Sequence, residues 1–180
     1  MKRQSNRRSE SGFTLIETLI ALAVLAVGVL SLSGVLASSL LYMNEDQDSY
    51  IAQQKALEAI ESIYTARDLQ QASWANINNT SQGGIFVVGN EQLCAAGPDG
   101  ILGTVDDDCT QIDSIVYPGP DGILGTSDDV YAKLGNFQRS ITITAVPGYA
   151  DLRQIVVVVT FTRGAFTRSY TLTCNISEYS

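Results

Sequence analysis

The chain has 180 residues, of which 45% are hydrophobic, and a formal net charge of −8 at pH 7. Such an acidic chain argues against nucleic-acid binding, which needs basic surface to neutralise phosphates. It contains no histidine, the commonest general base and transition-metal ligand, and no phosphate-binding loop, so the sequence does not predict an enzyme.

The first 44 residues predict a membrane segment. Residues 1–12 are polar and carry four cations against Glu10, whereas residues 18–44 contain no charged side chain. A helix needs about 20 apolar residues to cross a bilayer, and basic residues before it should stay cytoplasmic. A cleaved secretory signal fits poorly because the apolar stretch is long and follows the most plausible processing site, Gly12. A plain membrane anchor is the simplest interpretation.

Glu17 lies at the edge of this apolar stretch. A carboxylate within a membrane segment is costly and is usually paired and functional. Position alone leaves open whether Glu17 has such a role or only marks the interfacial end of the span.

Residues 12–17 read Gly-Phe-Thr-Leu-Ile-Glu, which resembles the class III signal of type IV prepilins and type II secretion pseudopilins. The resemblance implies that a membrane prepilin peptidase cuts between Gly12 and Phe13 and that Phe13 becomes N-methylated. It also implies that Glu17 pairs with the N-terminal amine of a neighbouring pilin or pseudopilin during assembly. Each charge of such a pair offsets the desolvation of the other.

Residues 21–34 are similar to the same helix in PilV-type minor pilins and in the minor pseudopilin I of type II secretion. Major pilins usually carry a proline in this helix, whereas the first proline here is Pro98. The resemblance therefore favours a minor subunit that initiates or tips a filament.

The head is expected to be an α+β roll. Apolar side chains at helical spacing predict that the helix continues to about Gln70 and packs on a sheet through Tyr50, Leu57, Ile60 and Tyr64. We expect three parts: a leader at 1–12, a transmembrane assembly helix at 13–44 and a periplasmic head at 45–180. Within the head, a long acidic insertion is expected at about 71–137, with short strands at 85–88 and 112–117.

The last third predicts antiparallel strands. Residues 141–145 alternate between apolar and polar, residues 154–162 are rich in valine, and Arg168, Tyr170, Leu172 and Cys174 share one face of a last strand. Turns are expected at 135–136, 147–148 and 163–164.

The insertion contains a repeat with an offset of 22 residues. Residues 97–104 and 119–126 both read Gly-Pro-Asp-Gly-Ile-Leu-Gly-Thr, and each is followed by one residue and an Asp-Asp pair. Carboxylates on turns suit a hard cation, so we favour calcium binding over a pair of solvated acidic turns. The predicted ligands are the aspartates of the two copies: Asp99, Asp106, Asp107, Asp121, Asp128 and Asp129.

Three cysteines suggest one disulfide and one spare thiol in an exported protein. Cys94 and Cys109 bracket the first copy of the repeat, and their pairing would close that loop. Cys174 is expected to be a buried free thiol, although its pairing with either of the others stays open.

Three functions are compatible with these features. The favoured one is a minor type IV pilin of the inner membrane and pilus. The second is a minor pseudopilin of a type II secretion system. The third is a calcium-dependent adhesin module that uses prepilin processing only for export.

Overall fold

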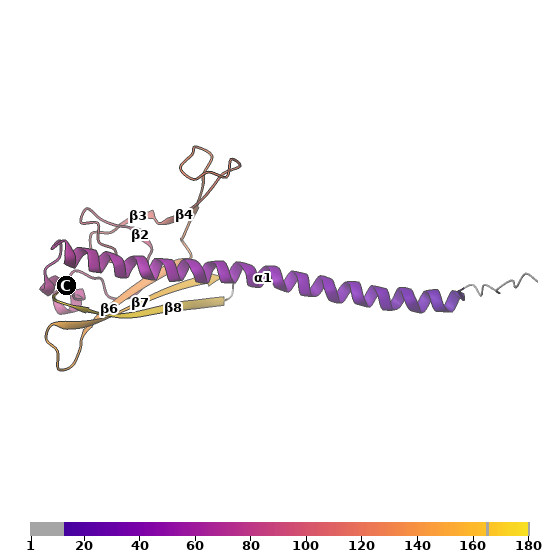
Figure 1. Cartoon of the computed structure of the whole chain (residues 1–180), viewed down its shortest axis with the longest axis horizontal. Coiled ribbons are helices and arrows are strands. Elements are labelled where there is room, and N and C mark those ends of the chain that lie inside the picture. The colour runs from indigo at the N-terminus through magenta and orange to yellow at the C-terminus, as the bar shows by residue number, and fades with distance from the viewer. Residues whose placement is uncertain (1–12, 165, 180) are drawn as a thin grey trace, which may run out of the picture. The chain divides into compact units, whose positions relative to one another are not determined.

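The computed structural model describes residues 13–164 and 166–179, with side chains for all of these except residues 41–45. The predicted leader, including Gly12, lies outside the described residues. The chain divides into two compact units, Met1–Asn44 and Glu45–Ser180. The helix α1, Leu15–Asp68, contributes to both units (Figure 1). The predicted α+β class is confirmed.

The remaining elements belong to the second unit. Two short 3-10 helices follow α1 at Trp74–Asn76 and Thr80–Gln82. The described strands are β1 (Glu91–Gln92), β2 (Cys94–Ala95), β3 (Asp108–Ile112), β4 (Ser114–Tyr117), β5 (Val130–Lys133), β6 (Phe137–Ala145), β7 (Leu152–Arg163) and β8 (Phe166–Ser177).

In the first unit, α1 is apolar and exposed. Its segment Leu15–Leu40 has 26 residues and a mean hydropathy of 2.6, with none of its most apolar window buried. By length and composition it is suited to cross a membrane. Thr14 caps the helix, because its backbone carbonyl and its Oγ1 both accept from the Glu17 amide.

In the second unit, four strands form an antiparallel sheet in the order β1-β6-β7-β8. Every second side chain is buried from Phe137 to Ile143 of β6 and from Ile155 to Phe161 of β7. The hairpins turn at Gly148 and Gly164, both of which have positive φ. The predicted strands and turns of the last third are therefore confirmed.

The head part of α1 contacts the core mainly through small side chains. Its buried apolar positions are Ala52, Ala56, Ala59, Ile60, Ile63 and Ala66. The predicted apolar stripe is wrong at Tyr50 and Leu57, which are exposed. Alanines allow a helix backbone to lie close to a sheet, so this face fills the core although it is less apolar than the stripe.

The end of α1 differs slightly from the prediction. The helix stops at Asp68, two residues before Gln70. Gln70 itself takes a left-handed φ of 56°, and the amides of Gln71 and Ala72 donate to the Ala66 carbonyl. A left-handed residue with these backward bonds is a common helix stop.

The insertion is more ordered than a plain loop. The predicted strand at 85–88 is wrong, because Phe86 forms only isolated bridges with Asn79 and Thr104. The predicted strand at 112–117 is interrupted at Asp113, between β3 and β4. The buried Asn79 side chain holds the insertion on β6, because it donates to Ile141 O and accepts from Ile143 N, each over 2.7 Å.

Candidate functional site

The two copies of the repeat adopt the same turn. In the first copy, the Ile101 amide donates to Asp99 Oδ1 over 2.8 Å, and the Gly103 amide donates to Asp107 Oδ2 over 2.7 Å. In the second copy the same bonds measure 2.8 and 2.6 Å and join Ile123 to Asp121 and Gly125 to Asp129. The repeated sequence therefore encodes a repeated structure in which aspartates close the turn.

A threonine and a glycine complete each turn. Thr104 Oγ1 donates to Asp106 Oδ1 over 2.7 Å, and this bond is the main reason that the pKa of Asp106 is lowered. In the second copy Thr126 does the same for Asp128, with the same effect on its pKa. A side chain in place of the first glycine, Gly97, would have its Cβ 2.3 Å from the Asp106 carbonyl oxygen.

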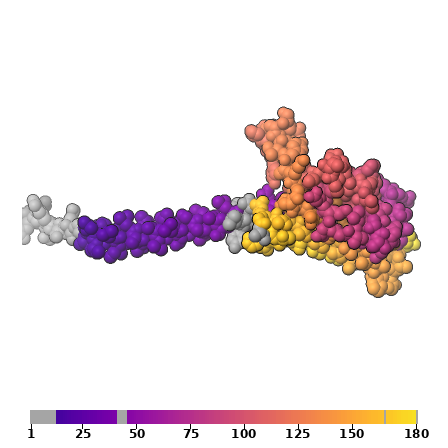
Figure 2. Space-filling model, turned by 180° about the vertical axis from the view of Figure 1, so that it is seen from behind, coloured from indigo at the N-terminus to yellow at the C-terminus, as the bar shows by residue number. Residues whose placement is uncertain are grey.

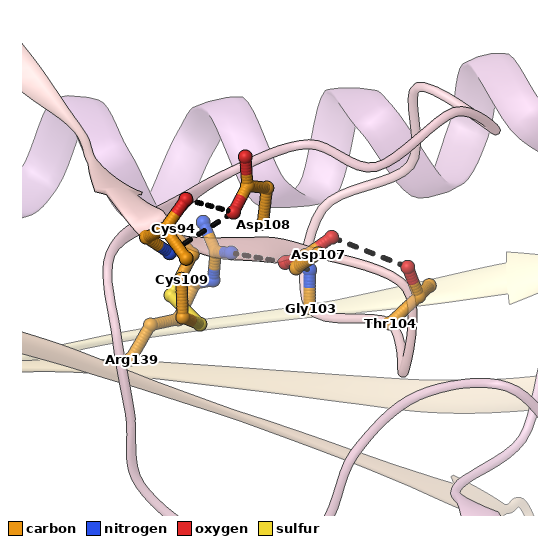
Figure 3. Close-up of a disulfide and its surroundings, with 8 residues drawn as sticks. Cys94, Gly103, Thr104, Asp107, Asp108, Cys109 and Arg139 are labelled. Carbon is orange, nitrogen blue, oxygen red and sulfur yellow. Dashed lines mark hydrogen bonds and ion pairs between the residues drawn. A yellow bond between two sulfur atoms is a disulfide. The ribbon is translucent and has the colours of Figure 1, made fainter.

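The first copy is fixed to the rest of the head. Ile101 is part of the core, and the Leu102 amide donates to Ser62 Oγ on α1 over 3.0 Å. Asp107 forms an ion pair with Arg139 of β6, as Figure 3 shows. These partners were not predicted from the sequence, although Arg139 lies on the inward face of β6 with its apolar neighbours.

The six aspartates of the two copies are the predicted calcium ligands. Within residues 13–164 and 166–179, no group of three or more His, Cys, Asp or Glu side chains is placed to hold a metal ion. One oxygen each of Asp99 and Asp107 already accepts a turn amide. Calcium binding at the repeats therefore stays a prediction.

The predicted disulfide is present. Cys94 and Cys109 are bonded across the β2–β3 pair, with their Cα atoms 4.6 Å apart, and the bridge closes the first copy of the repeat (Figure 3). Cys174 is a free thiol, as predicted, but it is only half-buried because β8 is an edge strand of the sheet. Partial burial raises the pKa of the Cys174 thiol.

The residues that the sequence links to assembly lie at the start of α1. Phe13 precedes the helix and is exposed, and Glu17 lies in the first helical turn with its side chain also exposed. Among the described residues no cation pairs with Glu17. A charge partner for this carboxylate would have to come from elsewhere.

The start of the chain matches one family model. Residues 7–33 match the prokaryotic N-terminal methylation motif. The match includes Gly12, Phe13 and Glu17 and the first part of the apolar helix. The comparison with curated proteins found no match, and neither did the comparison with solved structures.

The methylation motif supports a type IV pilin-like or pseudopilin-like precursor. It implies processing by a prepilin peptidase and assembly with other pilins, and it indicates a structural protein. Together with the apolar α1 segment, it suggests a membrane-anchored pilin. The match ends at residue 33, so it says nothing about the head.

Proposed function

We propose that the chain is a minor subunit of a type IV pilus. A prepilin peptidase would cut between Gly12 and Phe13 and methylate Phe13, and the mature subunit would enter the filament through α1. The head would stand in the periplasm before assembly. The single observation that carries this proposal is the methylation motif placed directly on an apolar helix with Glu17 in its first turn.

The exposed carboxylate of Glu17 supports a role in assembly. An unpaired charge in a membrane segment is unfavourable, and an N-terminal amine from a neighbouring subunit would neutralise it. The amine of Phe13 is released only by the cut after Gly12. Processing and assembly would therefore be coupled, because the cut creates the charge that Glu17 needs.

Two features favour a minor over a major position. The helix α1 runs for 54 residues, and the first proline of the chain, Pro98, follows its end. An α1 without proline keeps its backbone hydrogen bonds throughout and is not predisposed to melt in a filament shaft. The head also has an inserted repeat whose second copy is exposed.

The test is to shear filaments from cells that make the chain and to analyse them by mass spectrometry. The proposal predicts a mature chain that begins at a singly methylated Phe13 and is present in far fewer copies than the main subunit. A chain that retains residues 1–12, or one that forms the bulk of the filament, would contradict it.

The same measurement separates the two other functions. Recovery of the mature chain only in cells with an active type II secretion system would indicate a pseudopilin. A processed chain that stays outside every filament would indicate an exported binding module. Calcium at the acidic repeats is compatible with each of these roles.

A further inference from the structure

The two copies of the repeat share one fold but have opposite surroundings. In the first copy Ile101 is 2% exposed, whereas its equivalent in the second copy, Ile123, is 61% exposed. Leu124 beside it is also 61% exposed. The second copy joins β4 to β5 and projects from the rest of the head, as the loop above β4 in Figure 1 and the orange protrusion at the top of Figure 2 show.

The first copy shows what this turn contacts when it is docked. Its Leu102 amide donates to a helix hydroxyl, Ser62 Oγ. Its Gly103 lies against Ile141, since a Cβ at that glycine would come within 2.5 Å of Ile141 Cδ1. Its Asp107 pairs with the buried Arg139. The binding surface for this turn therefore combines an apolar pocket with a guanidinium group.

The second copy lacks each of these contacts. A Cβ at Gly125, the equivalent of Gly103, would meet nothing within 4 Å. Asp129, the equivalent of Asp107, pairs with no cation among the described residues, and its Oδ1 is buried there without a hydrogen-bond partner. The turn is nevertheless held in the docked shape by its own hydrogen bonds. A turn that is already in its bound shape loses little conformational entropy on binding.

We propose that the second copy, residues 119–129, is a docking element that inserts Ile123 and Leu124 into an apolar pocket beside an arginine or lysine on another protein. Its three aspartates, with no basic residue among them, match a basic rim around such a pocket. This inference goes beyond the proposed function and does not depend on it.

Another molecule of this chain is a poorer candidate for the partner protein. Residues 45–180 carry seven Lys and Arg against 17 Asp and Glu, a formal net charge of −10, so two heads repel each other. The only surface of the described head that is known to accept this turn is filled by the first copy. The Cys94–Cys109 disulfide holds that copy in place.

The test is photocrosslinking of the full-length chain in the cells that make it. The photoreactive residue p-benzoylphenylalanine replaces Ser127, which is exposed and leaves the apolar pair intact. The matched control carries the same residue at Val105, the equivalent position of the first copy, which is 73% exposed. Illumination should give one protein adduct from position 127 and none from position 105.

Two substitutions make the test specific. Leu124→Ser removes the apolar side chain that the partner would bury, and Asp129→Asn removes the charge that would face its cation. Each substitution should lower the adduct yield about tenfold. The crosslinked partner residues should be apolar and next to an arginine or lysine. Both variants should keep the Cys94–Cys109 disulfide, which a non-reducing gel checks.

Several outcomes would overturn the proposal. These are an adduct between two copies of this chain, an adduct with lipid alone, equal capture from position 105, a yield that neither substitution changes, and no adduct at all.

Discussion

Asp107 and Arg139 form a buried ion pair that joins the first acidic turn to the sheet. The distance from Arg139 Nη2 to Asp107 Oδ2 is 3.7 Å, and the two side chains are 4% and 5% exposed. Burial raises the pKa of the Asp107 carboxyl and lowers that of the Arg139 guanidinium. Each ion is therefore tolerated mainly because the other is present.

Replacement of Arg139 by methionine should destabilise the head strongly. The change would leave Asp107 buried without its counter-ion, which typically costs about 3–5 kcal/mol at neutral pH. Urea unfolding of residues 45–180 measures this cost. Lys133→Met on the exposed face of β5 is the matched control and should change stability by less than about 0.5 kcal/mol. Equal effects of the two substitutions would contradict the role of the pair.

The cost of Arg139→Met should depend on pH. Because burial raises the pKa of folded Asp107 above the unfolded value of about 3.9, the folded state binds more protons in that interval. Asp107 therefore adds stability as the pH falls through the interval. Without the guanidinium its pKa should be higher still, so the cost of the substitution should shrink from about pH 7 toward pH 4. A cost that grows on acidification would contradict this account.

The two equivalent glycines should respond differently to alanine. At Gly97 and Gly119 an added Cβ would lie 2.3 Å from a carbonyl oxygen, that of Asp106 or Asp128. Gly97→Ala should lower the Tm of the head by several degrees, because the strained turn carries the core residue Ile101. Gly119→Ala should change it little, because the second copy is exposed. Calorimetry of both variants measures this, and similar losses would be inconsistent with two differently anchored copies.

Removal of the disulfide should cost about 3 kcal/mol in the chain-entropy model, since the bridge closes a loop with a sequence separation of 15. Urea unfolding of the Cys94→Ser/Cys109→Ser double variant measures this loss. Cys174→Ser is the matched control, because that thiol is free, and it should behave like the native chain in oxidising and reducing buffer alike. A native chain insensitive to reduction would contradict the stabilising role.

Calcium should bind the repeats if the carboxylate oxygens that the turns leave unused converge on an ion. Isothermal titration of the head should then show heat, and the Tm should rise with calcium concentration. Asp121→Asn/Asp128→Asn should abolish binding in the second copy, and Asp99→Asn/Asp106→Asn in the first. Absence of both heat and a Tm shift would show that the repeats do not bind calcium.

The sequence predicted the sheet and the turns because strand alternation and Gly-containing turns are local signals. It failed at Tyr50 and Leu57 of the helix face and missed the alanines, because a stripe of alanines signals the core only when the sheet that they contact is known. The burial of Arg139 could have been predicted, because this residue lies on the inward face of an alternating strand. The difference in burial between Ile101 and Ile123 could not have been predicted from local sequence, because the two residues stand in identical octapeptides with different tertiary surroundings.

The most direct test of the proposed function is the incorporation of a Glu17→Ala chain into filaments. Glu61→Ala, which removes an exposed carboxylate from the head part of α1, is the control. Quantitative mass spectrometry of sheared filaments should detect the native and Glu61→Ala chains at equal levels. It should find the Glu17→Ala chain processed at Phe13 but left in the membrane. Normal incorporation of the Glu17→Ala chain would contradict assembly through this helix.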